Sequence, residues 1–150
     1  MIRLLDASAT RAAGAALAQL VEAGDAIALV GDLGAGKTTF VAGLVEALGA
    51  GPASSPTFSL VNEYPGGRLV VWHVDLYRLE RADELPELGL DDMIGDHRGI
   101  CLIEWADKFA VMPPDHLRIE LVHDGPARLL TAIGTGPRGT ALAGALGGRL

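Results

Sequence analysis

The residues from Ala26 to Leu48 constrain the fold more than any other part of the chain. Five apolar residues, Ala26 to Val30, predict a buried strand. The stretch Gly31-Asp32-Leu33-Gly34-Ala35-Gly36-Lys37-Thr38 follows and fits the phosphate-binding pattern G-x-x-x-x-G-K-[ST] at every fixed position. Apolar residues then recur at helical spacing, at Phe40, Val41, Leu44, Val45 and Leu48. A strand, a glycine-rich loop and a helix in this order predict a nucleotide-binding α/β domain.

Each part of this loop has a chemical role. Glycine lets backbone N–H groups approach a phosphate closely, because no Cβ stands in the way, and the start of the following helix adds a favourable dipole. Lys37 is expected to reach the β- and γ-phosphates, and the Thr38 hydroxyl is expected to bind Mg²⁺. The residues predicted to contact the nucleotide phosphates are Gly31, Asp32, Leu33, Gly34, Ala35, Gly36, Lys37, Thr38 and Thr39.

Length and composition predict one domain over residues 1–150, of which 49% are apolar. No apolar run reaches the roughly 18 residues of a membrane span, and the N-terminus is a poor signal peptide, so we expect a cytoplasmic protein without a membrane partner. The single Cys101 leaves no disulfide partner. A net charge of −7 argues against a chain that grips nucleic acid unaided, although it permits action on RNA through a partner protein.

The segments around the loop complete an α/β domain. A helix is expected over about residues 10–23, capped by Ser8 or Thr10. Two predicted hairpins pair residues 57–64 with 69–74 and residues 116–122 with 128–133. Short helices are expected within residues 76–96, a buried strand over 100–103, and at most a weakly ordered glycine-rich tail over 136–150. The predicted fold class is therefore α/β, a P-loop NTPase fold with a mixed sheet flanked by helices, in which antiparallel hairpins join a parallel core.

Two predicted strands end in a carboxylate, LVVWHVD at Asp75 and ICLIE at Glu104. Ligands of open α/β sheets bind at the carboxyl ends of the strands, so both acids are expected beside the phosphate loop as catalytic residues and Mg²⁺ ligands. Thr57, in a loop rich in Ser and Pro, is a third candidate and is expected to close over the γ-phosphate. His73 shares a strand face with Asp75, and a packed, hydrogen-bonded histidine is the preferred interpretation.

The motifs GDLGAGKTTF, SPTFSLVNEY, HVDLYRL, ELGL and IEWAD, in this order, resemble the TsaE (YjeE) family over about residues 1–135. That family comprises small bacterial ATPases required for making threonylcarbamoyladenosine in tRNA. The resemblance implies ATP and Mg²⁺ as ligands, TsaD- and TsaB-type proteins as partners, and contact with tRNA only through that complex. It also implies that Thr10 and Arg128 lie near the nucleotide, with Thr38, Asp75 and Glu104 at the metal and Lys37 and Thr57 at the reacting phosphate.

The same phosphate loop occurs in other classes of nucleotide-binding protein. A GTPase normally reads guanine with N-K-x-D, but the only asparagine here, Asn62, is followed by Glu63. A P-loop small-molecule kinase remains the alternative, with Arg78 and Arg81 as candidates for an arginine-rich lid. A pure interaction module would leave Lys37 and Thr38 without a role.

Overall fold

The computed structural model describes residues 1–32, 34–51 and 60–150, and within them a seven-stranded sheet forms the centre of the molecule. The strands are β1 (Ile2–Leu4), β2 (Ala26–Val30), β3 (Val61–Tyr64), β4 (Val70–Asp75), β5 (Gly99–Glu104), β6 (His116–Asp124) and β7 (Ala127–Thr135). The helices are α1 (Ala7–Ala18), α2 (Lys37–Ala47), α3 (Leu90–Met93) and α4 (Gly136–Arg149), with two 3₁₀ helices, η1 (Ala82–Leu88) and η2 (Ala106–Lys108).

The strand order β1-β7-β6-β2-β5-β4-β3 combines parallel and antiparallel pairs. Strands β6, β2, β5 and β4 form the parallel core. The pairs β3–β4, β6–β7 and β1–β7 are antiparallel. The predicted fold class, a mixed sheet with a parallel core and antiparallel hairpins, is therefore confirmed. The first hairpin is seen from Val61 onward, and residues 57–59 of its predicted strand lie outside the described residues.

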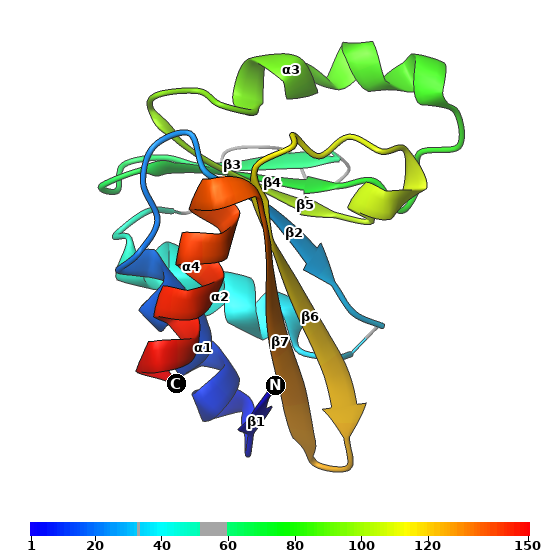
Figure 1. Ribbon diagram of the computed structural model, residues 1–150. Coiled ribbons are helices and arrows are strands. Elements are labelled where there is room, and N and C mark those ends of the chain that lie inside the picture. Colours follow the sequence, from blue (N-terminus) through cyan, green and yellow to red (C-terminus); the bar gives the residue numbers. More distant parts are fainter. Residues whose placement is uncertain (33, 52–59) are drawn as a thin grey trace.

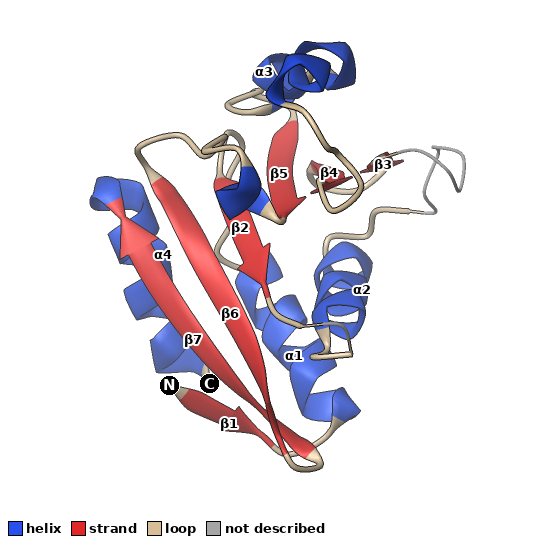
Figure 2. Cartoon of the chain, turned by 90° about the vertical axis from the view of Figure 1, so that its right-hand side faces the viewer, coloured by secondary structure: helices blue, strands red, loops and turns tan. Residues whose placement is uncertain are grey.

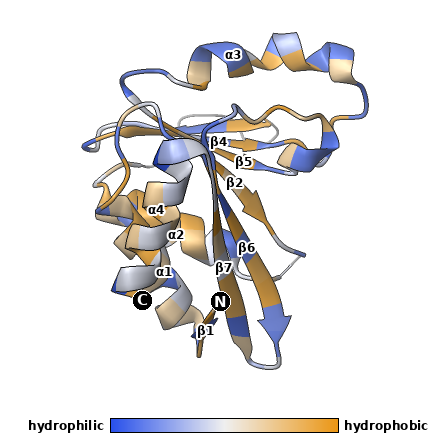
Figure 3. Ribbon diagram, in the orientation of Figure 1, coloured by the Kyte–Doolittle hydropathy of each residue, from blue (hydrophilic) through white to orange (hydrophobic). Residues whose placement is uncertain are grey.

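The two faces of the sheet bury different sets of side chains. Helices α1, α2 and α4 lie together on one side (Figures 1 and 2), where they cover residues such as Val71 and Leu102. Trp72 and Cys101 point to the other face and pack against the segment that contains η1 and α3. The central strand β2 is hydrophobic along its length (Figure 3) because both of its faces are covered. None of the helices in the described part of the chain is long and apolar enough to cross a membrane.

Helix α1 begins and ends earlier than the sequence predicted. Its N-cap is Asp6, whose Oδ1 accepts a hydrogen bond from the N–H of Ala9 at 2.8 Å, whereas Ser8 and Thr10 lie inside the helix. The helix ends at Ala18 and the chain then turns toward β2. Aspartate, serine and threonine are all good caps, so the sequence alone did not determine which of the three begins the helix.

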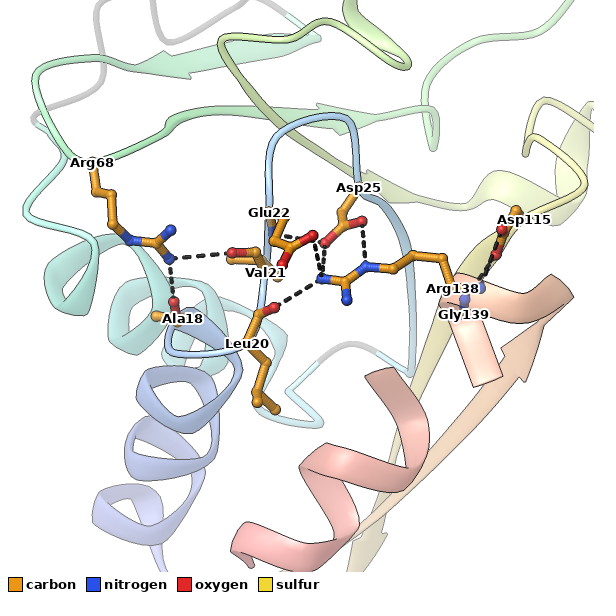
Figure 4. A network of polar contacts seen from close by, with 9 residues as sticks. All are labelled: Ala18, Leu20, Val21, Glu22, Asp25, Arg68, Asp115, Arg138 and Gly139. Carbon is orange, nitrogen blue, oxygen red and sulfur yellow. Dashed lines mark hydrogen bonds and ion pairs between the residues drawn. The ribbon is translucent and has the colours of Figure 1, made fainter. Parts of the chain in front are cut away.

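The glycine-rich end of the chain, predicted to be at most weakly ordered, forms the 14-residue helix α4, with Leu142 and Leu146 in the core. Long-range contacts explain the difference. The carboxylate of Asp115 accepts hydrogen bonds from the N–H groups of Arg138 and Gly139, which caps the first turn of α4 from another segment (Figure 4). Gly139 is also needed for close packing, because a Cβ there would lie 1.9 Å from the carbonyl oxygen of His116.

A partly buried ion pair joins α4 to the loop before β2 (Figure 4). The guanidinium of Arg138 donates to both carboxylate oxygens of Asp25, at 3.0 and 2.8 Å, and to the carbonyl oxygen of Leu20 at 2.8 Å. The Asp25 side chain is only 6% exposed. A buried carboxylate needs such a partner, so the end of the chain contributes to holding the entry of the central strand.

Two glycines of α4 provide a test of this packing. Gly139→Ala is expected to destabilise the fold by about 1–3 kcal/mol, because the added methyl group meets the backbone of β6. Gly144→Ala is the matched control in the same helix. Nothing lies within 4 Å of a Cβ at Gly144, so alanine should stabilise the fold by about 0.5–1 kcal/mol through its higher helix propensity. Urea unfolding measures both changes, and equal effects of the two variants would contradict the close packing of α4.

Candidate functional site

The loop between β2 and α2 has the geometry of an anion site. Gly34 and Gly36 have φ values of +80° and +102°, which favour glycine, and a Cβ at Gly31 would lie 2.6 Å from the carbonyl oxygen of Leu121. Helix α2 begins directly after Gly36, a residue without a capping side chain. The N–H groups of its first turn are therefore left for a ligand, and the helix dipole favours an anion there. Leu33 of the predicted set lies outside the described residues.

A cavity of about 580 Å³ lies in front of this loop. Residues from the loop, from the start of α2 and from the ends of β4 and β5 line it together. They are Asp32, Gly34, Gly36, Lys37, Thr38, Thr39, Asp75, Tyr77, Glu104 and Trp105. The structure thus brings Lys37, Thr38 and both strand-end carboxylates to one cavity. Thr57 lies outside the described residues, so its position relative to the cavity stays a prediction.

Lys37 is held inside the site by two oxygen atoms. Its Nζ donates to the carbonyl oxygen of Gly31 at 2.6 Å and lies 3.3 Å from Oε1 of Glu104. Both the lysine and the glutamate side chain are only 11% exposed. An entering phosphate would compete with these two partners for the ammonium group.

Glu104, the last residue of β5, is the buried carboxylate of the site. Its Oε2 lies 2.5 Å from Nε2 of His73 on the neighbouring strand β4. Burial raises the pKa of Glu104, but the hydrogen bond and charge of His73, together with the nearby Lys37, outweigh this effect and hold the pKa below its ordinary value. The side chain is therefore an ionised acceptor, as a metal ligand must be.

Asp75 is the exposed carboxylate of the site. It ends β4 directly beside Glu104 in the parallel register of β4 and β5, so the two acids emerge at the same edge of the sheet. Its Oδ1 accepts a hydrogen bond from the N–H of Tyr77 at 3.0 Å. This contact forms a local turn directly after β4.

The donors around the cavity suit a hard cation that shares its ligands with a phosphate. Among the described residues, no three His, Cys, Asp or Glu side chains lie close enough to hold a metal ion by themselves. Mg²⁺ is typically bound by one or two carboxylates together with phosphate oxygens and water. Asp75, Glu104 and the hydroxyl of Thr38 match that requirement.

Thr10 and Arg128 lie against the other side of the loop. A Cβ at Gly36 would be 3.3 Å from Cγ2 of Thr10 and 3.9 Å from Cγ of Arg128. Arg128 also donates from Nη2 to the carbonyl oxygen of Gly34 at 3.1 Å. Both residues are therefore next to the phosphate loop, although the cavity in front of it does not include them.

Two aromatic side chains border the cavity. The rings of Tyr77 and Trp105 lie 5.1 Å apart, and Nζ of Lys37 lies 5.7 Å from the Trp105 ring. Trp105 has a φ of +62°, a left-handed conformation that is uncommon for a bulky residue and often marks a functional site. Sequence reasoning missed Tyr77, whose one signal was its place two residues after Asp75.

The phosphate loop, the parallel core and the two strand-end carboxylates define a P-loop-type α/β protein. The chain resembles a crystal structure of YdiB from Bacillus subtilis, with a TM-score of 0.80 and 33% identity, over 99% of this chain and 93% of that one. Residues 4–130 match the family model described as "Threonylcarbamoyl adenosine biosynthesis protein TsaE". The chain therefore belongs to the TsaE family, as the sequence motifs predicted.

Relatives from distant bacteria support this assignment. The tRNA threonylcarbamoyladenosine biosynthesis protein TsaE of Bacillus subtilis (strain 168) is 40% identical over 125 residues, which cover 82% of this chain and 77% of the relative. The protein of the same name from Nostoc sp. (strain PCC 7120) is 41% identical over 126 residues, which cover 81% and 77%.

Proposed function

We propose that this chain is a cytoplasmic, Mg²⁺-dependent ATPase that serves threonylcarbamoyladenosine biosynthesis in tRNA together with TsaD- and TsaB-type partners. The observation that carries the proposal is the shared cavity of Lys37, Thr38, Asp75 and Glu104. Membership in the TsaE family supports the pathway and the partners. Contact with tRNA would come through the complex, in keeping with the net charge of −7.

Different residues of the cavity have different roles in the transfer of phosphate to water. The loop N–H groups and the first turn of α2 hold the phosphates, and Lys37 supplies a positive charge to them. Thr38, Asp75 and Glu104 supply oxygen ligands for Mg²⁺, which neutralises the charge that develops on the phosphates. A carboxylate oxygen that does not bind the metal can orient the attacking water.

Adenine is the expected base. The guanine-reading segment is missing, and Asn62 lies in β3 opposite His73. Thr10 and Arg128 are placed next to the phosphate loop, where the family resemblance expects contacts to the nucleotide. In the kinase alternative, Arg81 would exchange its exposed ion pair with Asp83 at η1 for a phosphate.

The two lysines of the chain allow a controlled test of nucleotide binding. Lys37→Ala is expected to weaken ATP binding about tenfold or more, because a charge-assisted contact to phosphate is lost. Lys108→Ala is the control, because Lys108 does not line the cavity of about 580 Å³ and its Nζ donates to a backbone oxygen, that of Tyr77. Calorimetric titration measures both affinities, and thermal unfolding verifies the fold. Unchanged ATP affinity in the folded Lys37 variant would contradict the proposed role of the loop.

Hydrolysis by the isolated chain is expected to be very slow. Of the described residues, no arginine lines the cavity, and an arginine supplied to the transferred phosphate can accelerate the reaction by about 10³–10⁵. We expect addition of TsaD- and TsaB-type proteins to raise phosphate release from ATP. A rate of about 1–100 s⁻¹ for the isolated chain, as in kinases, would refute partner dependence.

A double-mutant cycle tests whether Asp75 and Glu104 share one ion. Asp75→Asn and Glu104→Gln should each weaken Mg²⁺-dependent ATP binding while the fold is preserved. If both act through one cation, their effects on the binding free energy should deviate from additivity by about 1 kcal/mol or more. Calorimetry at fixed Mg²⁺ supplies the four affinities. Full additivity would return one of the two carboxylates to a structural role, for which the hydrogen bond of Asp75 to Tyr77 already offers a reason.

A further inference from the structure

His73 makes a contact that its position in the sheet does not require. It lies in the middle of β4, opposite Leu102 of β5, on the face covered by α1 and α2. Its Nε2 lies 2.5 Å from Oε2 of Glu104, and the two side chains are 14% and 11% exposed. Because an ionised carboxylate can only accept, the N–H at Nε2 is the donor. Water competes little for this hydrogen bond, since both groups are largely buried.

The second ring nitrogen argues against a role in packing alone. Nδ1 of His73 is buried and has no hydrogen-bond partner among the described residues. A buried polar atom without a partner costs free energy, so an apolar side chain of similar size would suit this strand position better. The benefit of a histidine here lies in its bond to Glu104.

The two oxygens of Glu104 have different partners. Oε2 is bound by His73, while Oε1 faces the ammonium group of Lys37 at 3.3 Å. Lys37 also belongs to the phosphate loop, so an incoming phosphate draws on the same ammonium group. His73 is not part of the loop, and its bond does not depend on where Lys37 points.

We propose that His73 is a positioning residue, which fixes Oε2 of Glu104 so that Oε1 stays directed at the cavity as a metal ligand after Lys37 has turned to the phosphates. The inference rests on the proposed function and adds a residue to its metal site. Without His73, the carboxylate would rotate once Lys37 leaves, and the metal would lose a fixed ligand. Removal of such an outer partner typically lowers metal affinity by about 10- to 100-fold.

The test compares three variants with the unchanged chain. His73→Leu replaces the imidazole with an apolar side chain of similar bulk, which removes the N–H donor to Glu104. His73→Gln restores an N–H donor on a side chain of similar length. His116→Leu is the matched control, because Nδ1 of His116 contacts the carbonyl oxygen of Pro113 at 2.7 Å, away from the residues that line the cavity. ATP affinity is measured by calorimetry in EDTA and over a Mg²⁺ series, and the fold is verified by thermal unfolding.

The leucine variant is expected to need about tenfold more Mg²⁺ for half of the metal-dependent gain in ATP affinity. Its affinity for ATP in EDTA should fall by a smaller factor than its affinity at the original Mg²⁺ concentration, since Lys37 and the loop are intact. The glutamine variant should show nearly the Mg²⁺ dependence of the unchanged chain. The His116 control should show the same dependence as the unchanged chain. If His73 had a purely structural role, its replacement by leucine would change the thermal midpoint, but ATP affinity would change by the same factor in EDTA and in Mg²⁺.

The outcomes distinguish this inference from the proposed function. If the unchanged chain binds no ATP, or binds it without any effect of Mg²⁺, the proposed function fails. If the unchanged chain responds to Mg²⁺ and the folded leucine variant responds equally, the positioning role of His73 is overturned. A leucine variant that does not fold, or a glutamine variant without recovery, would also overturn it, since the contact would then serve the fold or require the ring itself.

Discussion

The register of three parallel strands determines the geometry of the site. Leu29 of β2 pairs with Glu104 of β5, and Glu104 pairs with Asp75 of β4, so the three strands reach the phosphate-loop edge of the sheet together. A shift by one residue would turn Glu104 to the opposite face, away from Lys37 and His73. The buried apolar side chains on both faces of β5 prevent such a shift, because it would exchange the two cores. The hydrophobic packing of the sheet is thus the physical origin of the contacts in the site.

The pairing of Lys37 with Glu104 couples two binding events in the proposed function. Both side chains are buried and satisfy one another, which offsets part of the cost of removing their charges from water. A phosphate that attracts Lys37 leaves Glu104 as a buried carboxylate with His73 as its remaining neighbour. A cation at Glu104 replaces the lost positive charge, so nucleotide and metal should each favour binding of the other.

Local sequence patterns predicted those parts of the fold that depend on residues close together in the chain. The strand Ala26–Val30, the phosphate loop and the following helix were predicted because their pattern is contained in one stretch. The placement of Asp75 and Glu104 at one edge followed from the rule for strand ends. Their roles at a metal stay predictions. Helix α4 was missed because its stabilising groups, Asp115 and Asp25, belong to distant segments and become partners only in the folded chain. The prediction that His73 is hydrogen-bonded is confirmed, but its partner Glu104 was not predicted, since the two residues are 31 positions apart and meet only through the register of β4 and β5.

Unfavourable features collect at the end of β5. Glu104 is a buried charge, the next residue, Trp105, has a left-handed backbone, and a buried nitrogen of His73 lacks a partner among the described residues. A left-handed non-glycine residue alone costs about 1–3 kcal/mol and persists only where the surrounding structure enforces it. The enforcing structure is visible in the pairing of β5 with β2 and β4 along both sides and in the ring of Tyr77 against Trp105. Fold stability alone would select a less strained turn after β5. The left-handed turn instead keeps the indole ring within 5.7 Å of the ammonium group of Lys37, so the strain is explained by the cavity that it shapes.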